Sequence, residues 1–217
     1  MAIEPDFATF ARVYDAGRPQ ALHARLIADL ETPVSAFLKL GEGRDNAFLL
    51  ESVQGGETRG RYSIIGFKPD LIWRCRNGKA EINRSARANA DAFVPADHAD
   101  KPLESLRKLM LATQMELPRS LPPMAVGLFG YLGYDMVRLI ERLGEAPTDT
   151  LGLPDAILLR PTVTAIFDNI RDEIILVSPV WPEAGIDARA AYARGSERLN
   201  DAINDLERPA PAAPTPP

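Results

Sequence analysis

Apolar residues recur at helical spacing in five stretches of the 217-residue chain. In the first stretch, Phe7, Phe10 and Tyr14 fall on one face of a helix. Asp6 is placed to cap this helix and Gly17 to end it. The other four stretches are 20–31, 102–110, 135–143 and 187–206. We therefore expect five helices, of which the last is the longest.

The second stretch is predicted as a helix because Leu22, Leu26 and Leu30 recur at a spacing of four. Thr32-Pro33 is expected to stop it, since the residue before a proline disfavours the helical conformation. The chain is thus predicted to begin with two consecutive helices.

Shorter apolar runs, either alternating or compact, predict β-strands. They cover 34–40, 47–53, 61–67, 71–75, 79–82, 124–131, 156–160, 163–167 and 173–178. Asn77-Gly78 joins two of these runs and predicts a tight hairpin, whereas Pro161 is expected to separate two others. Because strands and helices are mixed without regular alternation, we expect an α+β fold, with mixed or antiparallel sheets and flanking helices.

Length and composition place the chain among ordinary globular proteins. Hydrophobic residues make up 46% and charged residues 25% of the sequence. The length allows one large domain or two small ones. We expect a folded region over 1–207, followed by an extended Pro-rich spacer at 208–217. The net charge of -5 provides no basic field for nucleic acid or anionic lipid.

The sequence also predicts a cytoplasmic protein. The first seven residues lack the basic and apolar regions of a signal peptide, and no apolar run is long enough to cross a bilayer. The single cysteine, Cys75, excludes an internal disulfide and fits a reducing compartment. It is expected to be a buried or half-buried strand residue.

Catalytic motifs are not evident. His23 and His98 have no partners at zinc-ligand spacing, and nucleophile elbows and phosphate-binding glycine loops are missing. Gly127, Gly130 and Gly133 recur every three residues, which is the wrong spacing for a phosphate cradle. They are interpreted as points where a strand packs closely against its neighbour.

The run 47–53 has the most distinctive pattern. In an extended strand, Phe48, Leu50 and Ser52 share one face, so that an apolar shelf ends in a hydroxyl group. Such a shelf suits an apolar ligand with one polar end. It equally fits a core strand whose serine hydrogen-bonds to the backbone.

Glu51 lies among apolar neighbours in the same run. A carboxylate in that setting needs a partner or a place at the sheet edge. The partner is either Arg59 or Arg61 from the next strand, or the ammonium group of a ligand.

Three segments, taken in order, resemble one known family. They are Leu49-Leu50-Glu51-Ser52, Gly60-Arg-Tyr-Ser-Ile-Ile-Gly66 and Met124-Ala-Val-Gly-Leu-Phe-Gly-Tyr-Leu-Gly-Tyr-Asp135. Their order and spacing, with the Asn-Gly hairpin and the strand pair around Arg160-Pro161, are similar to the N-terminal region of anthranilate synthase component I. The resemblance extends from about residue 6 to residue 207.

This resemblance implies a regulatory role. In the family, the Leu-Leu-Glu-Ser motif contacts the feedback inhibitor tryptophan, which assigns Leu50, Glu51 and Ser52 to a tryptophan site. Arg61 falls where the family has a cationic residue near the ligand. The site is expected to be completed by the region that follows in the family, so this chain alone should bind tryptophan weakly.

The resemblance also implies partners and chemistry outside this sequence. The whole enzyme converts chorismate to anthranilate in a C-terminal catalytic region that uses Mg²⁺, with ammonia from a glutamine amidotransferase subunit (component II). We expect that region, its catalytic residues and its cofactor to be missing here. Two alternatives stay open. One is the matching region of aminodeoxychorismate synthase, which often lacks the glutamate found at Glu51. The other is a ligand-free scaffold that packs the catalytic region and docks the amidotransferase.

Overall fold

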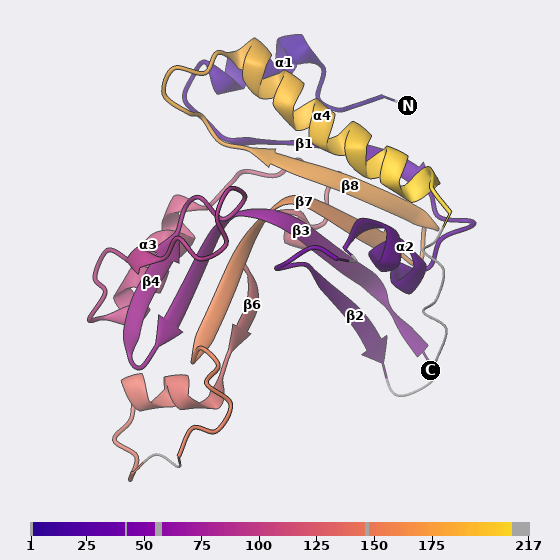
Figure 1. The fold of residues 1–217 in the computed structure, drawn as a ribbon. Coiled ribbons are helices and arrows are strands. Elements are labelled where there is room, and N and C mark those ends of the chain that lie inside the picture. Colours follow the sequence, from indigo (N-terminus) through magenta and orange to yellow (C-terminus); the bar gives the residue numbers. More distant parts are fainter. Residues whose placement is uncertain (1, 42, 55–57, 146–147, 210–217) are drawn as a thin grey trace. The chain divides into compact units, whose positions relative to one another are not determined.

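The computed structural model describes residues 2–41, 43–54, 58–145 and 148–209, without the side chains of 53–59 (Figure 1). The chain divides into two compact units. Unit 1 comprises Met1–Lys68, Met115–Val126 and Thr162–Pro217, and unit 2 comprises Pro69–Gln114 and Gly127–Pro161. Most of the predicted Pro-rich spacer, from residue 210 onward, lies outside the described residues.

Unit 1 is an antiparallel sheet with three helices packed on one face. Its strands follow the order β1-β8-β7-β3-β2. The strands are β1 Gln20–Ile27, β2 Phe48–Gln54, β3 Thr58–Arg76, β7 Ala156–Asp168 and β8 Glu173–Val180, and the helices are α1 Phe7–Tyr14, α2 Pro33–Leu40 and α4 Ala188–Glu207. One apolar core joins the helices to the sheet, and it includes Phe10, Leu22, Leu40, Ile65, Leu176 and Leu199.

Local interactions determine where two of these helices begin and how α4 docks. Asp6 caps α1 through a 2.8 Å hydrogen bond from a first-turn N–H, as predicted, and Asp187 caps α4 through a 2.7 Å bond. Gly195 lets α4 approach the sheet closely. A Cβ atom there would lie 2.7 Å from Leu22 Cδ1 and 2.9 Å from Val180 Cγ2.

Unit 2 is organised around a buried tryptophan. The second half of β3 pairs with β4 (Lys79–Asn83), β4 pairs with β5 (Val94–Pro95), and the first half of β7 pairs with β6 (Phe129–Leu132). Trp73 is fully buried, and its Nε1–H donates to Ser105 Oγ of α3 (Pro102–Ala112) at 3.1 Å. This core also contains Leu71, Leu106, Leu109 and Met136.

The predicted Asn-Gly hairpin is confirmed, and Cys75 lies beside it. Asn77 and Gly78 have φ values of 51° and 68°, the left-handed conformation that a two-residue hairpin turn requires. Cys75 is fully buried in the strand, as predicted. Burial, together with the carboxylate of Asp155 whose Oδ2 lies 3.9 Å from Sγ, raises the pKa of the Cys75 thiol to about 11.

Two of the three regularly spaced glycines confirm the interpretation of close packing. A Cβ atom on Gly130 would lie 2.0 Å from the carbonyl oxygen of Ile157, and one on Gly133 would lie 2.8 Å from that of Asp155. Gly127 makes no such close approach, because the nearest neighbour of a Cβ atom there would be the Phe129 ring at 4.0 Å. Strand β6 therefore depends on glycine to lie against β7.

The segments around β6 differ from the prediction. The strand expected at 124–131 is shorter, because a 3₁₀ helix, η1, occupies Pro123–Ala125. The α-helix expected at 135–143 is a 3₁₀ helix, η2, at Tyr134–Leu139. Its buried contact is Met136, one of the residues that the predicted apolar stripe contained.

The helix predicted at 20–31 is wrong, because Gln20–Ile27 form β1. A spacing of four puts Leu22 and Leu26 on one face of a strand as well as of a helix, since four is a multiple of the strand period. Pairing with β8 along the whole of β1 decides between the two.

The strand predicted at 34–40 is also wrong, because Pro33–Leu40 form α2. Thr32 and Ser35 make a reciprocal cap. The Ser35 N–H donates to Thr32 Oγ1 at 3.1 Å, and the Thr32 N–H donates to Ser35 Oγ at 2.9 Å. Pro33 occupies the first turn, where its missing N–H is not needed. Thr32-Pro33, interpreted as a stop signal, is therefore a start signal.

The strand break predicted at Pro161 is wrong, and Pro69 also lies within a continuous strand. β3 and β7 are long strands that pass from one unit into the other at these prolines. Lys68, which precedes Pro69, has a φ of 51°, an irregularity at which a sheet tolerates proline. Its carbonyl accepts a 2.7 Å hydrogen bond from Thr162 Oγ1.

Antiparallel pairing with flanking helices confirms the predicted α+β class. The helices predicted for the first stretch, for 102–110 and for 187–206 are also confirmed, as α1, α3 and α4. Within the described residues, none of the helices has the length and apolar character needed to cross a membrane.

Candidate functional site

The motif Leu50-Glu51-Ser52 lies in the middle of β2. Leu49, its neighbour, packs against the core of unit 1. Leu50 points to the opposite face of the sheet and is 49% exposed. Glu51 and Ser52 are also exposed. The three predicted site residues are therefore accessible to a ligand.

Phe48 and Leu50 form an apolar shelf above β3, which we call the β2 shelf. Phe48 pairs with Gly66 in the ladder, and a Cβ atom on that glycine would lie 2.3 Å from the phenylalanine ring. Leu50 pairs with Ile64, two residues further along the same face of β3. Glycine at position 66 is thus what allows the aromatic ring to lie flat against the sheet.

Ser52 extends this shelf by resting on a second glycine. The β2–β3 ladder shifts register at Ser52, yet its side chain lies directly over Gly60, where a Cβ atom would be 1.9 Å from Oγ. The register shift places residues 60–62 of β3 opposite Ser52, so regular alternation does not extend from Gly66 to Gly60. Phe48 and Leu50 share a face, as the sequence predicted, and Ser52 lies over Gly60 next to them along β2.

Arg61 lies on β3 but pairs with a residue that the sequence did not suggest. Its Nε and Nη2 donate to Oδ1 and Oδ2 of Asp168 at 3.2 and 2.9 Å. The guanidinium carbon lies 4.7 Å from the centre of the Tyr62 ring. Of the three partners left open for Glu51, Arg61 forms no ion pair with it among the described side chains, and the Arg59 side chain lies outside them. The ammonium group of a ligand stays a prediction.

The Arg61–Asp168 pair is ionised at neutral pH. Burial of Asp168, whose side chain is 2% exposed, opposes ionisation. Hydrogen bonds from Arg61 and from the Ile170 N–H outweigh burial and lower the pKa of Asp168 below its ordinary value. The same hydrogen bond raises the pKa of Arg61. The pair fixes a cation next to the β2 motif.

Asn169 connects the turn after β7 to the beginning of β3 through two hydrogen bonds. Its backbone N–H donates to the Arg61 carbonyl at 2.8 Å, and its Nδ2 donates to the Gly60 carbonyl at 2.7 Å. Sequence reasoning treated 168–172 only as a turn and missed this role. The available signal was a pair of polar residues, Asp168 and Asn169, directly after an apolar strand.

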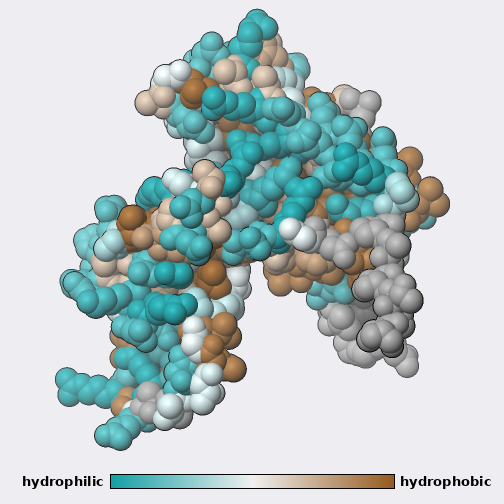
Figure 2. Space-filling view, in the orientation of Figure 1, coloured by the Kyte–Doolittle hydropathy of each residue, from teal (hydrophilic) through white to brown (hydrophobic). Residues whose placement is uncertain are grey.

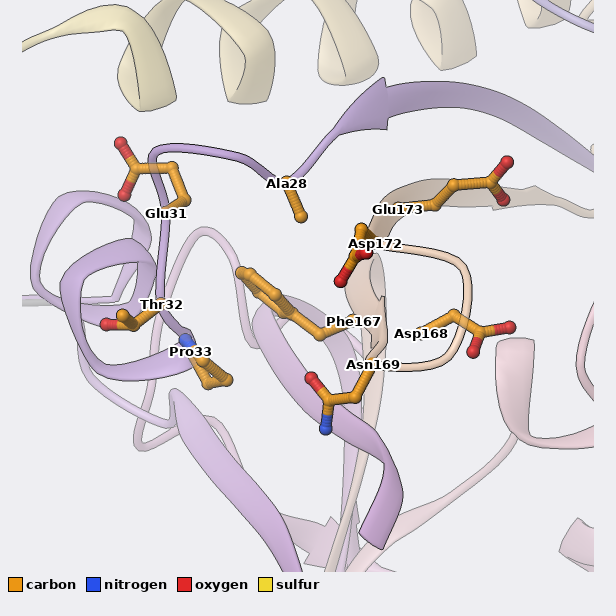
Figure 3. Close-up of a pocket in the computed structure, with 9 residues that line it drawn as sticks. All are labelled: Ala28, Glu31, Thr32, Pro33, Phe167, Asp168, Asn169, Asp172 and Glu173. Atoms are coloured by element: carbon orange, nitrogen blue, oxygen red, sulfur yellow. The ribbon is translucent and has the colours of Figure 1, made fainter. Parts of the chain in front are cut away.

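A polar pocket of about 140 Å³ lies beside this turn (Figure 3). It is lined by Ala28, Glu31, Thr32, Pro33, Phe167, Asp168, Asn169, Asp172 and Glu173. Figure 3 shows Phe167 and Asn169 facing the residues that lead into α2. The pocket is adjacent to the Arg61–Asp168 pair, because Asp168 belongs to both.

The carboxylates around this pocket are largely paired within the protein. Glu31 accepts from Lys39 and Ser35, and Glu173 accepts from Arg25 at 2.8 Å. Within the described residues, no group of three or more acidic, histidine or cysteine side chains is arranged to hold a metal ion. Most carboxylates that line the pocket are therefore paired with groups of the protein itself.

His23 is buried in β1. Its backbone exchanges hydrogen bonds of 2.9 and 2.8 Å with that of Glu4. Neither ring nitrogen has a hydrogen-bond partner among the described residues, although Glu4 Oε2 lies 3.5 Å from Nε2. Burial lowers the pKa of His23; Glu4 offsets this in part, and Arg25 adds to it.

We expect stability to fall on acidification below the ordinary histidine pKa of 6.5. The unfolded chain binds the proton more readily than the buried ring, so the contribution of neutral His23 is complete above that value and decreases below it. The decrease is at most about 1.4 kcal/mol per pH unit. Urea unfolding between pH 7.5 and 5.5 measures it. His23→Gln should flatten the dependence, and His98→Gln, at an exposed histidine, should not; equal slopes for all three proteins would contradict the assignment.

Comparisons with known proteins give relatives that are named anthranilate synthase component 1. The chain is 53% identical over 206 residues to anthranilate synthase component 1 of Cereibacter sphaeroides, which covers 95% of this chain and 41% of the relative. It is 37% identical to the protein of the same name from Thermus thermophilus, over 87% of this chain and 36% of the relative. The chain thus spans about two fifths of the length of these relatives. No protein-family model matches it.

A solved structure with a similar fold carries the same name. The crystal structure of anthranilate synthase component I from Streptococcus pneumoniae matches with a TM-score of 0.52 and 24% identity, over 87% of this chain and 38% of that one. At this identity the likeness supports the fold alone. With the sequence relatives, it confirms the resemblance that the motifs around Ser52, Arg61 and Gly130 indicated.

Proposed function

We propose that this chain is the tryptophan-sensing N-terminal region of an anthranilate synthase component 1, and that it has no catalytic activity by itself. The observation that carries the proposal is the exposed Leu50-Glu51-Ser52 motif on β2, in a chain 53% identical to a protein of that name. Under this proposal, the full enzyme makes anthranilate from chorismate in the cytoplasm, and tryptophan inhibits it.

The β2 shelf has the chemistry that the indole of tryptophan requires. Phe48 and Leu50 offer an apolar surface on which an aromatic ring buries area, and Ser52 at its end offers a hydroxyl group. Glu51 alternates to the other face of β2 from Leu50, and because β2 is the last strand of the described sheet, its exposed carboxylate is proposed to reach the ligand ammonium around that edge. A zwitterion leaves water only when both of its charges are paired.

Arg61 is the proposed partner of the ligand carboxylate. A guanidinium group has five N–H donors, and Asp168 accepts from two of them. The buried carboxylate holds the guanidinium in position while its outer edge, on a side chain 43% exposed, remains accessible. In this proposal Asp168 positions Arg61 and does not contact the ligand.

Among the described residues the shelf has only one wall, because Leu50 and Ser52 are exposed and Phe48 is half-buried. We infer that the rest of the longer polypeptide supplies the opposite wall, and that the chorismate and Mg²⁺ sites lie there as well. A glutamine amidotransferase subunit would supply ammonia to that region. A half-site that leaves the zwitterion in water should bind tryptophan weakly.

Calorimetric titration of tryptophan tests the proposal. We expect the full-length protein to bind tryptophan and to discriminate against phenylalanine, whereas the 217-residue chain should bind at least about tenfold more weakly, a loss of about 1.4 kcal/mol. Absence of binding to the full-length protein would exclude the regulatory role. It would leave the region of aminodeoxychorismate synthase, or a scaffold that docks the amidotransferase, as the remaining functions.

A further inference from the structure

The backbone that carries Arg61 is not held by a regular β2–β3 ladder. The register of that ladder shifts between Glu51 and Val53, so that residues 60–62 of β3 have no regular partner among the described ladder pairs with β2. Irregularities of this kind bend a strand and change the direction of its side chains. The position of the Arg61 guanidinium therefore depends on contacts from elsewhere in unit 1.

Asn169 supplies such contacts from the turn between β7 and β8, residues 168–172, which we call the β7–β8 turn. Its backbone N–H donates to the Arg61 carbonyl at 2.8 Å, and its Nδ2 donates to the Gly60 carbonyl at 2.7 Å. One residue thus holds two consecutive carbonyl groups of β3. The Asn169 side chain is half-buried, and hydrogen bonds that are partly shielded from water are stronger than exposed ones. Asn169 therefore fixes β3 where the ladder is interrupted.

The β7–β8 turn is itself anchored. The Ala28 N–H donates to the Asp172 carbonyl at 2.8 Å, which joins the turn to the connection between β1 and α2. Figure 2 shows hydrophobic surface at the end of unit 1 where Figure 1 places that connection, and Ile27, the last residue of β1, is 77% exposed. Within the turn, Asp168 Oδ1 accepts from the Ile170 N–H at 3.1 Å. The turn is therefore a fixed support for the residues that it contacts.

Two neighbouring residues of this turn hold Arg61 at both of its ends. Asp168 accepts from the guanidinium at 2.9 and 3.2 Å, and Asn169 holds the backbone. Figure 3 shows the side chains of Asp168 and Asn169 leaving the turn in different directions. An arginine that is fixed in this way loses less conformational freedom when it pairs with a ligand. The affinity of Arg61 for a carboxylate should therefore depend on the turn.

We propose that Asn169 is a positioning residue of the tryptophan site, and that it acts through Arg61 on the affinity for the ligand carboxylate. This inference rests on the proposed function, because that function assigns Arg61 to the carboxylate. In this proposal Asn169 makes no contact with the ligand and determines only where the guanidinium lies. A free α-carboxylate is then the feature of the ligand that the β7–β8 turn selects.

Tryptophan inhibition of the full-length enzyme tests this role in four proteins, which are the wild type, Asn169→Ala, Arg61→Gln and the double variant. We expect Asn169→Ala to raise the tryptophan concentration for half-inhibition at least about tenfold when Arg61 is present, and less than about twofold in the Arg61→Gln background, because coupled residues are not additive. A residue that only stabilises the fold would have the same effect in both backgrounds. Equal effects, or no effect when Arg61 is present, would overturn the proposal.

Two further variants separate positioning from general stability. Asn169→Asp keeps the size of the side chain and the backbone N–H but places an oxygen against the Gly60 carbonyl, so it should weaken inhibition at least as much as Asn169→Ala. Asn83→Ala is the matched control, because Asn83 Nδ2 donates to the Asn89 carbonyl at 2.8 Å in unit 2. It should lower the thermal midpoint without changing inhibition. Wild-type sensitivity of Asn169→Asp, or a loss of sensitivity in Asn83→Ala equal to that of Asn169→Ala, would contradict the proposal.

Calorimetric titration of the wild-type full-length protein with tryptophan separates this inference from the proposed function. If tryptophan does not bind the wild type, the sensor is rejected and the role of Asn169 is rejected with it. If tryptophan binds and inhibits the wild type and Asn169→Ala responds equally, the sensor stands and the role of Asn169 alone is rejected. Binding to the wild type, with a loss in Asn169→Ala that requires Arg61, supports both.

Discussion

Ser52→Phe in the full-length enzyme is expected to raise the tryptophan concentration needed for half-inhibition by at least about a hundredfold, or about 2.8 kcal/mol of binding free energy. Ser52 is exposed at the end of the β2 shelf, so a phenyl ring there fills the space proposed for the ligand without entering the core. It also removes the hydroxyl. Activity without tryptophan should be largely unchanged, because the substitution lies outside the proposed catalytic region. Anthranilate formation from chorismate at increasing tryptophan measures both.

Two controls make this result specific. Ser85→Phe adds the same ring at an exposed serine of unit 2 and should leave inhibition intact. Gly60→Ala should weaken inhibition without changing Ser52 itself, because the new Cβ would occupy the position of the Ser52 hydroxyl. Full sensitivity of Ser52→Phe to tryptophan would remove the β2 shelf from the regulatory site.

Trp73→Ala is expected to lower the free energy of unfolding of unit 2 by about 4 kcal/mol. The indole is fully buried, and its removal leaves a cavity between the strands and α3. It also leaves Ser105 Oγ without its donor. A loss of this size is a large fraction of the stability of a typical domain. Urea unfolding followed by circular dichroism measures it.

Two milder substitutions separate packing from hydrogen bonding. Ser105→Ala keeps the indole but leaves its buried N–H unpaired, which should cost about 1–3 kcal/mol. Trp73→Phe keeps most of the apolar volume and should fall between the other two. A loss below about 1 kcal/mol for Trp73→Ala would show that this core does not hold unit 2 together.

Elements with a local physical signal could be predicted from the sequence. Asn77-Gly78 requires a left-handed turn wherever it occurs between strands, and the hairpin formed as expected. Asp6 stands directly before the helix that it caps. The turn and the helix cap depend only on residues a few positions away, so a short stretch of sequence is enough to predict them.

The helix predicted at 20–31 and the strand predicted at 34–40 were wrong for a different reason. A spacing of four is compatible with both periods, so Leu22 and Leu26 could not distinguish β1 from a helix. The deciding interaction is pairing with β8, about 150 residues away along the chain. Thr32-Pro33 was ambiguous in the same way, because proline both ends helices and begins them.

The candidate site could be predicted only in part, because some of its contacts join residues that are far apart in the sequence. Alternation along a single strand predicts that Leu50 points away from the core, and the structure confirms this. The partner of Arg61 is Asp168, 107 residues further on, and a single sequence does not indicate which of many acidic residues will meet a given arginine. Whether these residues bind tryptophan stays a prediction.

The single thiol of this chain has a practical consequence. With a pKa of about 11, the Cys75 thiol is almost entirely un-ionised at pH 7.5, and the side chain is fully buried as well. Maleimide reagents react with thiolates, so the folded chain should behave as though it contained no cysteine. A cysteine introduced at an exposed position outside the β2 shelf, such as Ser85, would then be the only site labelled, and a fluorophore placed there would leave the proposed ligand site unaltered.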